Sequence, residues 1–383
     1  MDSGGTLHRT GPMGKIKRAI GLMSGTSMDG IDVAAIDTDG QSHIQIRGFQ
    51  GLPYPEDFRD RLKSAVQDAR GMQDRDARPG CLEEIEREST QFHGEAVTTF
   101  LAVLGWAPET VDIVGYHGQT VLHQPDAGLT VQLGDGQTLA DKIGIPVVFD
   151  LRAADVAAGG QGAPLAPVYH QALASSYGQS PIAVLNIGGV ANVTWIGADD
   201  DLLSFDTGPG NALLDDWVKQ HTGQSCDIDG TLAKAGQVDR TIVEQLLRQP
   251  YFSQQPPKSL DRDAWKIDGI EGLSLENGAA TLTACTAETI AAAEKLLPSV
   301  PAAWIVCGGG RHNETMMAML ASVLSGRVMT AEDAGWNGDA IESEAWAYLA
   351  VRSLAGLPIT FPGTTGVDRP LSGGVLYLPD VNI

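Results

Sequence analysis

The chain has 383 residues, of which 43% are hydrophobic and 19% charged, a balance typical of a folded protein rather than a disordered one. Its formal net charge of −22 argues against nucleic acid or an anionic membrane as the main partner, so any bound phosphate must be held by local groups. No apolar run reaches the roughly 18 residues of a membrane span, and the N-terminal stretch lacks the apolar segment of a secretory signal. Four scattered cysteines predict reduced thiols in a cytoplasmic protein.

The first half of the chain predicts three strands, a helical region, a strand, a helix and a final strand. These elements fall at residues 18–23, 32–39, 43–49, 55–104, 111–120, 137–144 and 146–150. The second half repeats this order and adds a closing helix. Its elements fall at residues 182–189, 192–197, 202–210, 212–221, 282–297, 302–310, 313–324, 327–330 and 341–354.

The repeated order predicts a duplicated α/β fold with a cleft between the two copies. The boundary is expected within residues 150–167, where glycines and prolines interrupt both the helical and the strand pattern. We therefore expect a first domain at residues 15–150, to which residues 357–383 can return, and a second domain at 151–356. One large α/β domain with long insertions is the alternative.

A glycine-rich turn joins the first two strands in each half, "MSGTSMDG" and "NIGGVAN". Backbone N–H groups and the hydroxyls of Ser24, Thr26 and Ser27 are suited to phosphate oxygens, although two ordinary hairpins would look the same. A carboxylate next to phosphate is repulsive unless a cation lies between them. Asp29 or Asp32 is therefore a candidate for a water-mediated Mg²⁺ contact, or Asp29 simply caps the turn.

A third glycine cluster, Gly308 to Gly310, lies between a predicted buried strand and a helix. Nucleotides bind at this kind of position in α/β folds, whereas close packing of the strand against the helix is the alternative interpretation. Neither GxGxxG nor GxxxxGK[ST] is present there, so the cluster does not indicate a dinucleotide site or a P-loop.

Asp206 ends a predicted strand just before "TGPGN" and has no neutralising residue near it in the sequence. This position suits a general base that deprotonates water or a hydroxyl, although the same residue could close a turn. The stretches "YHGQT" and "DVAAGGQG" add histidine, glutamine and aspartate at loop positions, where they could bind a polyhydroxylated ligand.

Together, "GLMSGTSMDGID", "YHGQT", "DVAAGGQGAPL", "LNIGGVANVT", "FDTGPGN" and "VCGGG" resemble the anhydro-N-acetylmuramic acid kinases of peptidoglycan recycling. The resemblance implies duplicated ribonuclease H-like domains of the actin/hexokinase type around a central cleft. It also implies an ATP-dependent enzyme that opens the 1,6-anhydro ring of 1,6-anhydro-N-acetylmuramic acid and phosphorylates O6. An ATP-driven scaffold or chaperone similar to actin or Hsp70 is the alternative.

The resemblance assigns Asp206 as the base that activates the attacking water, with ATP as the phosphoryl donor. Mg²⁺ is the second expected cofactor, with Asp29 near the metal through water, as argued above for the first turn. The expected nucleotide-binding residues are Ser24, Gly25, Thr26, Ser27, Met28, Asp29, Gly30, Ile31, Gly188, Gly189, Gly308, Gly309 and Gly310. The expected sugar-binding residues are His117, Gln119, Arg152, Asp155, Gln161, Asn211 and Glu342. Arg152 is the single basic residue of "LRAAD", where relatives can carry more arginine. A homodimer is compatible with the sequence.

Overall fold

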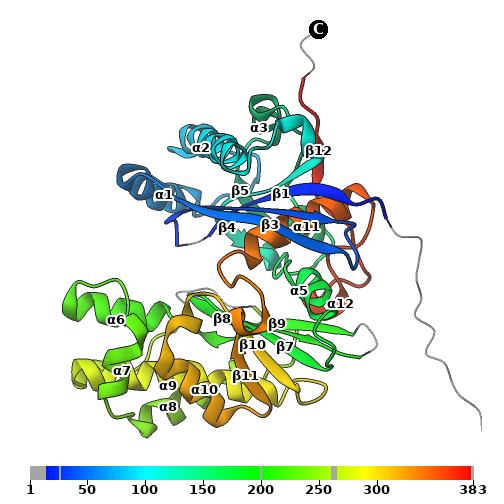
Figure 1. Ribbon diagram of the computed structural model, residues 1–383. Helices are drawn as coiled ribbons and strands as arrows, with labels where there is room; N and C mark the ends of the chain where they lie inside the picture. The colour runs from blue at the N-terminus through cyan, green and yellow to red at the C-terminus, as the bar shows by residue number, and fades with distance from the viewer. Residues whose placement is uncertain (1–13, 26, 199–200, 260–264, 381–383) are drawn as a thin grey trace, which may run out of the picture.

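The computed structural model describes residues 14–25, 27–198, 201–259 and 265–380, which form two β-sheets with helices around them (Figure 1). None of the helices in these ranges is both long and apolar enough to cross a membrane. The first sheet has the strand order β12-β6-β4-β1-β2-β3, and β5 pairs with β4. Its strands are β1 (Lys17–Ser24), β2 (Gly30–Thr38), β3 (Ile44–Pro53), β4 (Ile113–Gln124), β5 (Leu129–Leu133), β6 (Val147–Phe149) and β12 (Val375–Tyr377).

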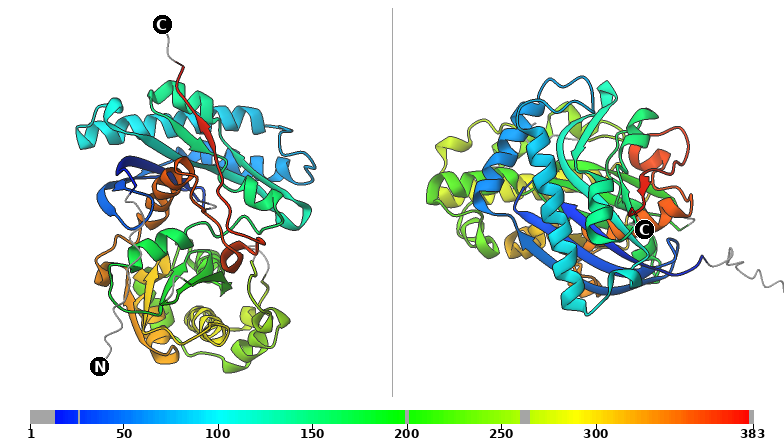
Figure 2. Two further views of the ribbon diagram at one scale, coloured as in Figure 1. Left: turned by 90° about the vertical axis from the view of Figure 1, so that its right-hand side faces the viewer. Right: turned by 90° about the horizontal axis from the view of Figure 1, so that it is seen from above.

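The outer face of the first sheet is covered by helices that bury one apolar side each. These helices are α1 (Glu56–Ala69), α2 (Leu82–Leu104) and α3 (Gly136–Ile143). Helix α2 ends at Gly105, whose φ of 66° closes the last turn in the left-handed conformation that glycine adopts most easily. Apolar side chains of α1 and α2 join those of β1 and β4 in one core, and α2 runs across the sheet (Figure 2).

The second sheet has the order β11-β10-β7-β8-β9. Its strands are β7 (Ile182–Ile187), β8 (Val190–Ile196), β9 (Leu202–Pro209), β10 (Ala303–Cys307) and β11 (Arg327–Thr330). In each sheet an antiparallel meander of three strands comes first, and two further strands then join parallel on the other side of its first strand. The two sheets therefore share one topology, which confirms the predicted duplicated α/β fold.

A group of helices packs on the outer face of the second sheet and forms a small core of its own. They are α6 (Ala212–Thr222), α7 (Thr231–Ala235), α8 (Arg240–Leu247), α9 (Leu275–Glu294) and α10 (Glu314–Val323). Helix α9 contacts all four of the others and strand β9, so it connects the helical group to the sheet.

Two helices, α5 (Pro167–Ala174) and α11 (Ile341–Leu354), lie between the sheets (Figure 1). Helix α11 contacts β1, β2 and β4, whereas α5 contacts β8 and β9. A Cβ atom on Gly21 would lie 1.8 Å from the carbonyl oxygen of Ser343, and one on Gly115 would lie 2.0 Å from that of Trp346. Glycine at these two strand positions therefore allows α11 to lie directly on the first sheet.

The chain leaves the first sheet after β6, passes through α4 (Ala153–Ala157) and reaches the second sheet by way of α5. After α11 it continues through α12 (Pro362–Thr365) to β12, which pairs antiparallel with β6. Residues 375–377 thus lie in the first sheet, and α11 packs on that sheet although residues 341–354 precede the proposed boundary at 356. The division into residues 15–150 and 151–356 stays a proposal.

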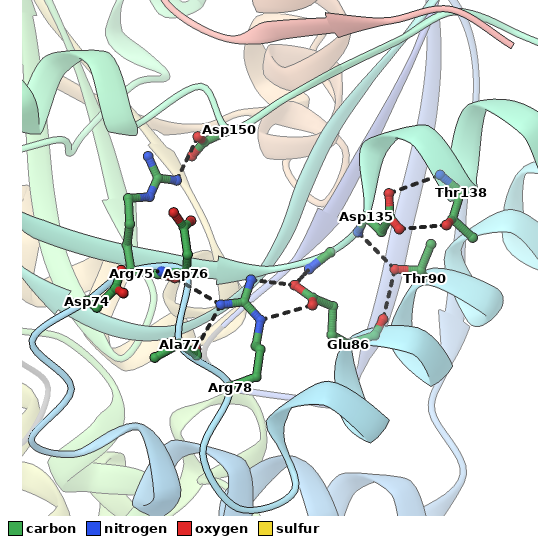
Figure 3. A network of polar contacts seen from close by, with 11 residues as sticks. Asp74, Arg75, Asp76, Ala77, Arg78, Glu86, Thr90, Asp135, Thr138 and Asp150 are labelled. Atoms are coloured by element: carbon green, nitrogen blue, oxygen red, sulfur yellow. Dashed lines mark hydrogen bonds and ion pairs between the residues drawn. The ribbon is translucent and has the colours of Figure 1, made fainter.

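A polar network fixes the loop between α1 and α2 (Figure 3). The guanidinium of Arg78 donates to both carboxylate oxygens of Glu86, at 2.9 and 2.7 Å, and Glu86 Oε1 also accepts the N–H of Gly134 at 3.1 Å. Arg75 donates to Asp150 Oδ2 at 2.6 Å. The network therefore connects this loop to α2, to the turn before α3 and to the residue at which the chain leaves the first sheet.

Candidate active site

A cavity of about 410 Å³ lies between the two sheets, and residues of both sheets and of α11 line it. Its polar and charged lining residues are Asp32, Arg152, His170, Asn186, Asn192, Asp206, Ser259, Asp339 and Glu342. Its larger apolar lining residues are Met23, Pro164, Leu165, Ile341, Trp346 and Leu349. An apolar wall with a limited number of polar groups is typical of a site for a small organic ligand.

The backbone of Asp206 is held on both sides while its side chain lines the cavity. Its N–H donates to the carbonyl oxygen of Lys258 at 3.1 Å, and its own carbonyl oxygen accepts from the hydroxyl of Tyr251 at 2.6 Å. Partial burial lowers the pKa of Lys258 to about 8, an effect that the nearby Asp206 opposes. Asp206 thus presents a carboxylate from a fixed backbone, close enough to the cationic side chain of Lys258 for the two charges to interact.

Arg152 lines the cavity from the segment between the two sheets and is held by three neighbours. Its guanidinium donates to the carbonyl oxygen of Gly162 at 2.8 Å, contacts His117 Nε2 at 3.1 Å and lies 5.2 Å from the ring centre of Trp346. Burial lowers the pKa of Arg152 to about 10, and Glu342 and Asp155 act in the opposite direction. Arg152 therefore remains cationic at neutral pH.

The hydrogen bonds of His117 determine its tautomer. Its Nδ1 lies 3.1 Å from the carbonyl oxygen of Ser24, which can only accept, so Nδ1 carries the proton and Nε2 accepts from Arg152. Burial, followed by the charge of Arg152, lowers the pKa of His117 well below its usual value. His117 is thus a neutral acceptor that orients Arg152.

Acidic side chains gather at one end of the cavity. Burial, followed by the charges of Asp29, Glu342 and Asp339, raises the pKa of Asp32 to about 7. Burial also raises the pKa of Glu342, against the effects of Arg152 and of Asn186, whose Nδ2 donates to Glu342 Oε1 at 3.0 Å. Negative charge therefore exceeds what the nearby protein groups neutralise.

That excess of negative charge fits a divalent cation that arrives with a ligand. No group of three or more His, Cys, Asp or Glu side chains placed to hold a metal directly occurs among the described residues. Since Mg²⁺ usually keeps several waters and takes few protein ligands, the exposed Asp29 and the partly buried Asp32 are suited to outer, water-mediated contacts.

The turn between β1 and β2 has an exposed part and a buried part. Ser27 donates its hydroxyl to Asp29 Oδ1 at 2.7 Å, and both side chains are exposed. Ser24 is buried and donates to Gln119 Oε1 at 2.7 Å, while Gln119 Nε2 donates to the carbonyl oxygen of Gly25 at 3.2 Å. Ser24 and Gln119 thus support the turn from below and do not line the cavity.

The other predicted residues of this turn lie at its edges. Ile31 is buried in the core of the first sheet, Gly30 pairs with Pro53 of β3, and Met28 adopts a φ of 55°. Thr26 lies outside the described residues.

The second glycine turn and the third glycine cluster meet at the cavity. The carbonyl oxygens of Gly188 and Gly189 accept N–H groups at the start of α6, including that of Asn211 at 2.7 Å. Gly308 has a φ of 73°, and a Cβ atom there would lie 2.3 Å from Asn186 Oδ1. Gly188, Gly308 and Gly309 line the cavity. Without side chains at these positions, the backbone can approach both the neighbouring turn and a ligand in the cavity.

Gly310 is buried and faces Ile187, and Asn211 Nδ2 donates to the carbonyl oxygen of Ile187 at 3.1 Å. These two predicted residues therefore lie beside the turn that lines the cavity rather than in the lining itself.

Asp155 and Gln161 make contacts within the protein. Asp155 is buried, and its two oxygens accept from the Gly162 N–H and the Thr365 hydroxyl, each at 2.6 Å. Gln161 Oε1 accepts from the hydroxyl of Ser259 at 2.9 Å. Asp155 thus fixes the loop that carries Gly162, the residue to which Arg152 donates, while Gln161 joins that loop to the segment beside Asp206.

Several cavity residues were not among the predicted site residues. Asn186 and Asn192 flank the second glycine turn, and polar residues at strand ends next to glycines are a usable signal for a site. His170 and Trp346 carry no such signal, because each lies in a helix whose neighbouring residues are mainly buried or apolar. Asp339 follows a glycine in the turn before α11, away from any strand end.

Comparison with known proteins identifies the family. The model of the family described as anhydro-N-acetylmuramic acid kinase matches residues 17–379. A relative of that name from Rhizobium etli is 52% identical over 370 residues, which covers 96% of this chain and all of the relative. Another of that name from Azorhizobium caulinodans is 55% identical over 368 residues, covering 94% of this chain and 99% of the relative.

Among solved structures, component A of the (R)-2-hydroxyglutaryl-CoA dehydratase of Acidaminococcus fermentans is similar to this chain with a TM-score of 0.48 and 12% identity. The match covers 88% of this chain and 99% of that one, and a likeness at this level carries no functional information. The near full-length sequence matches do not favour the scaffold or chaperone alternative. From the family match and these relatives, the chain belongs to the anhydro-N-acetylmuramic acid kinase family.

Proposed function

We propose that the chain uses ATP and water to convert 1,6-anhydro-N-acetylmuramic acid into N-acetylmuramic acid 6-phosphate in the cavity between the two sheets. The observation that carries this proposal is the position of Asp206, a carboxylate on a fixed backbone in a cavity shared with Arg152 and Glu342. Closure of the two sheets around the bound substrates would keep bulk water away from the transferred group, since water would otherwise compete as the acceptor.

In the proposed reaction, Asp206 accepts a proton from a water molecule whose oxygen forms a bond to C1 of the sugar. The bond between C1 and O6 breaks, and O6 takes the electron pair. O6 then forms a bond to the γ-phosphorus of ATP, the bond to the β-γ bridging oxygen breaks, and ADP leaves. The products are the 6-phosphorylated sugar with a hydroxyl at C1, ADP and the proton on Asp206.

Arg152 and Glu342 are proposed to bind the sugar beside Trp346. Arg152 is cationic and uses two of its N–H groups on Gly162 and His117, which leaves others for a carboxylate or phosphate oxygen of the ligand. Glu342 accepts from Asn186 through Oε1 and faces the cavity, so it can accept from a sugar hydroxyl. His117, Gln119 and Asp155 are proposed to act through the residues that they hold in place.

The nucleotide is proposed to lie along the glycine turns that border the cavity. The exposed part of the β1–β2 turn offers backbone N–H groups to phosphate oxygens, and the Ser27 hydroxyl can join them if it turns away from Asp29. Gly188 and Gly189 oppose this turn from the second sheet. Gly308 to Gly310 are proposed to lie near the adenosine. Bound Mg²⁺ would neutralise phosphate charge, with Asp29 and Asp32 orienting its water ligands.

Product analysis tests this proposal directly. Purified protein with ATP, Mg²⁺ and the anhydro sugar should release ADP and the 6-phosphorylated sugar in equal amounts, and omission of the sugar should abolish ADP release. Sugar-independent ATP turnover, or a phosphorylated product that keeps the anhydro bridge, would contradict the proposal. Excess chelator should stop the reaction and added Mg²⁺ should restore it, so full activity in chelator would reject the metal.

We also propose a cytoplasmic location, supported by the absence of any disulfide among the described residues, in which all four cysteines are free. The proposed partners are the two substrates, with no role for nucleic acid or a membrane, and a homodimer is compatible with this function. Gel filtration with light scattering measures the oligomeric state.

A further inference from the structure

His170 lines the cavity, although neither the predicted motifs nor the proposed mechanism uses it. It lies on α5, only 4% of it is exposed, and its Nδ1 is 3.0 Å from the hydroxyl oxygen of Thr194 on β8. Thr194 is the one hydrogen-bond partner of the His170 ring among the described residues. The second ring nitrogen, Nε2, is therefore available to a ligand in the cavity.

A chain of hydroxyl groups determines which nitrogen of His170 carries the proton. Ser204 donates its hydroxyl hydrogen to the carbonyl oxygen of Val193 at 2.8 Å, because that oxygen can only accept. The contact of 3.3 Å between the hydroxyls of Thr194 and Ser204 must therefore be donated by Thr194. Thr194 then has no hydrogen left for His170, so Nδ1 of His170 is the donor and Nε2 carries a lone pair.

The strand register places His170 near the proposed base. Thr194 pairs with Ser204, and Asn192 pairs with Asp206, so both pairs lie on the same face of the second sheet, two residues apart along each strand. Two residues of a strand span about 7 Å, which is close to the width of one sugar ring. A sugar that presents C1 to Asp206 can therefore reach His170 with a substituent.

Burial lowers the pKa of His170 to about 4, so the ring is neutral wherever the enzyme would be assayed. Its Nε2 consequently acts as a permanent acceptor rather than as a donor or a titrating base.

We propose that Nε2 of His170 accepts a hydrogen bond from the sugar and thereby selects substrates that carry a donor at that position. The inference rests on the proposed function, because it takes the anhydro sugar as the ligand. In that sugar O1 and O6 form the bridge, O3 carries the lactyl ether and the lactyl carboxylate is ionised. The acetamido N–H and the 4-hydroxyl are the two donors that remain, and either one would supply the same chemistry.

A cycle of enzyme variants and substrate analogues tests the inference. Two analogues each lack one donor: in one an acetoxy group replaces the acetamido group, and in the other the 4-hydroxyl is absent. For the wild-type enzyme, the analogue without the recognised donor should lose about tenfold in kcat/KM, since the acceptor is left without its partner. In His170→Phe, KM for the natural sugar should rise about tenfold and KM for ATP should stay unchanged. In this variant, kcat/KM for that same analogue should be little lower than kcat/KM for the natural sugar.

Equal penalties for each analogue in the wild type and in His170→Phe would overturn the inference. His93→Phe is the matched control, because His93 is also a buried neutral histidine but lies in the core between α2 and the first sheet, away from the cavity lining. It should leave KM for the sugar unchanged. His170→Gln, which keeps an acceptor, should recover part of the lost affinity.

A second measurement uses the wild type alone and is independent of how the variants fold. Nitrogen NMR of the histidine rings should show His170 protonated at Nδ1, and addition of the anhydro sugar should shift the Nε2 signal of this residue. An unshifted signal at saturating sugar would also overturn the inference. Failure of the wild type to phosphorylate the natural sugar would instead reject the proposed function, so the two failures are distinguishable.

Discussion

Replacing Asp206 by Asn removes the proposed base and keeps its main-chain contacts. The structure holds this residue through its main-chain N–H and carbonyl groups, which bind Lys258 and Tyr251, and the substitution leaves these hydrogen bonds in place. Asn has nearly the same shape as Asp but does not accept a proton at neutral pH. We therefore expect the folded structure and ATP affinity to persist while proton removal from water is lost.

The expected loss in kcat is about 10²- to 10⁴-fold, the usual contribution of a positioned general base. At about 1.4 kcal/mol for each factor of ten, this equals about 3–5 kcal/mol of transition-state stabilisation. ADP release at saturating ATP and sugar gives kcat, and calorimetric titration with a non-hydrolysable ATP analogue gives nucleotide affinity. In the same variant the pKa of Lys258 should fall further below about 8, because the charge that opposes its lowering is gone.

Asp126→Asn is the matched control, because it removes an exposed carboxylate outside the cavity. It should keep full activity and an unchanged melting temperature. Near-full kcat in Asp206→Asn would refute the assignment of the base. A loss that is confined to ATP affinity would refute it as well, since a base acts on the chemical step.

Three further predictions concern stability and motion. Between pH 4 and 7 the native state keeps a proton on Asp32 that the unfolded chain loses, so the contribution of this group to stability falls as pH rises. The free energy of unfolding of Asp32→Asn should therefore be about 1–2 kcal/mol higher than that of the wild type at pH 8, but not at pH 4. Thermal unfolding in chelator measures this, and an equal gain at both pH values would contradict it. Arg78→Met should lower the free energy of unfolding by about 2 kcal/mol, because Glu86 loses both guanidinium hydrogen bonds. Urea unfolding measures this, and a change below about 0.5 kcal/mol would show that the pair contributes little. If the two sheets close on the ligands, the radius of gyration from small-angle scattering should fall when the sugar and a non-hydrolysable nucleotide are both present, and a constant radius would reject closure.

We propose that such a closure hinges at the boundary loop of residues 159–162, in which Gly159 and Gly160 are not equivalent as probes. A Cβ atom on Gly160 would lie 2.2 Å from Asp155 Oδ1, and the Gly160 N–H donates to the Asp155 carbonyl oxygen at 2.9 Å. Gly160→Pro would therefore disrupt the loop as well as stiffen it. Gly159 has a φ of 85° and open space around it, so Gly159→Ala is the more selective perturbation of the hinge.

The order of the strands was predictable because each one is a short apolar run that ends at glycine or at a change of pattern. The hairpin of β4 with β5 was missed although the sequence carries its signal, since "PDAG" at residues 125–128 is a turn sequence and "LTVQL" at residues 129–133 alternates apolar and polar residues. Helices α7 and α8 were also not predicted, because they are short and lie among polar and proline-containing segments.

Side-chain direction limited the prediction of the site. Asp206, expected from its position at a strand end, and Arg152 and Glu342, expected from the family resemblance, all line the cavity. Gln119 and Asp155 occupy equally suggestive loop positions, yet their polar atoms bind Ser24, Gly25, Gly162 and Thr365. A local pattern shows that a polar group lies near a turn, but only the packed structure decides whether it faces a ligand or a neighbouring backbone.

The position of α11 has a consequence for how the protein is made. The first sheet ends its central strands at residue 149, but the helix that covers their inner face begins at residue 341, and the edge strand β12 follows at 375. At ribosomal rates of about 5–20 residues per second, the inner face of that sheet stays without α11 for on the order of 10–40 s after its central strands are synthesised. The second sheet, whose strands and outer helices are complete by residue 330, can fold during this interval. The N-terminal half of the chain is therefore the last to be finished, and chaperones that bind exposed apolar strands have their longest opportunity there.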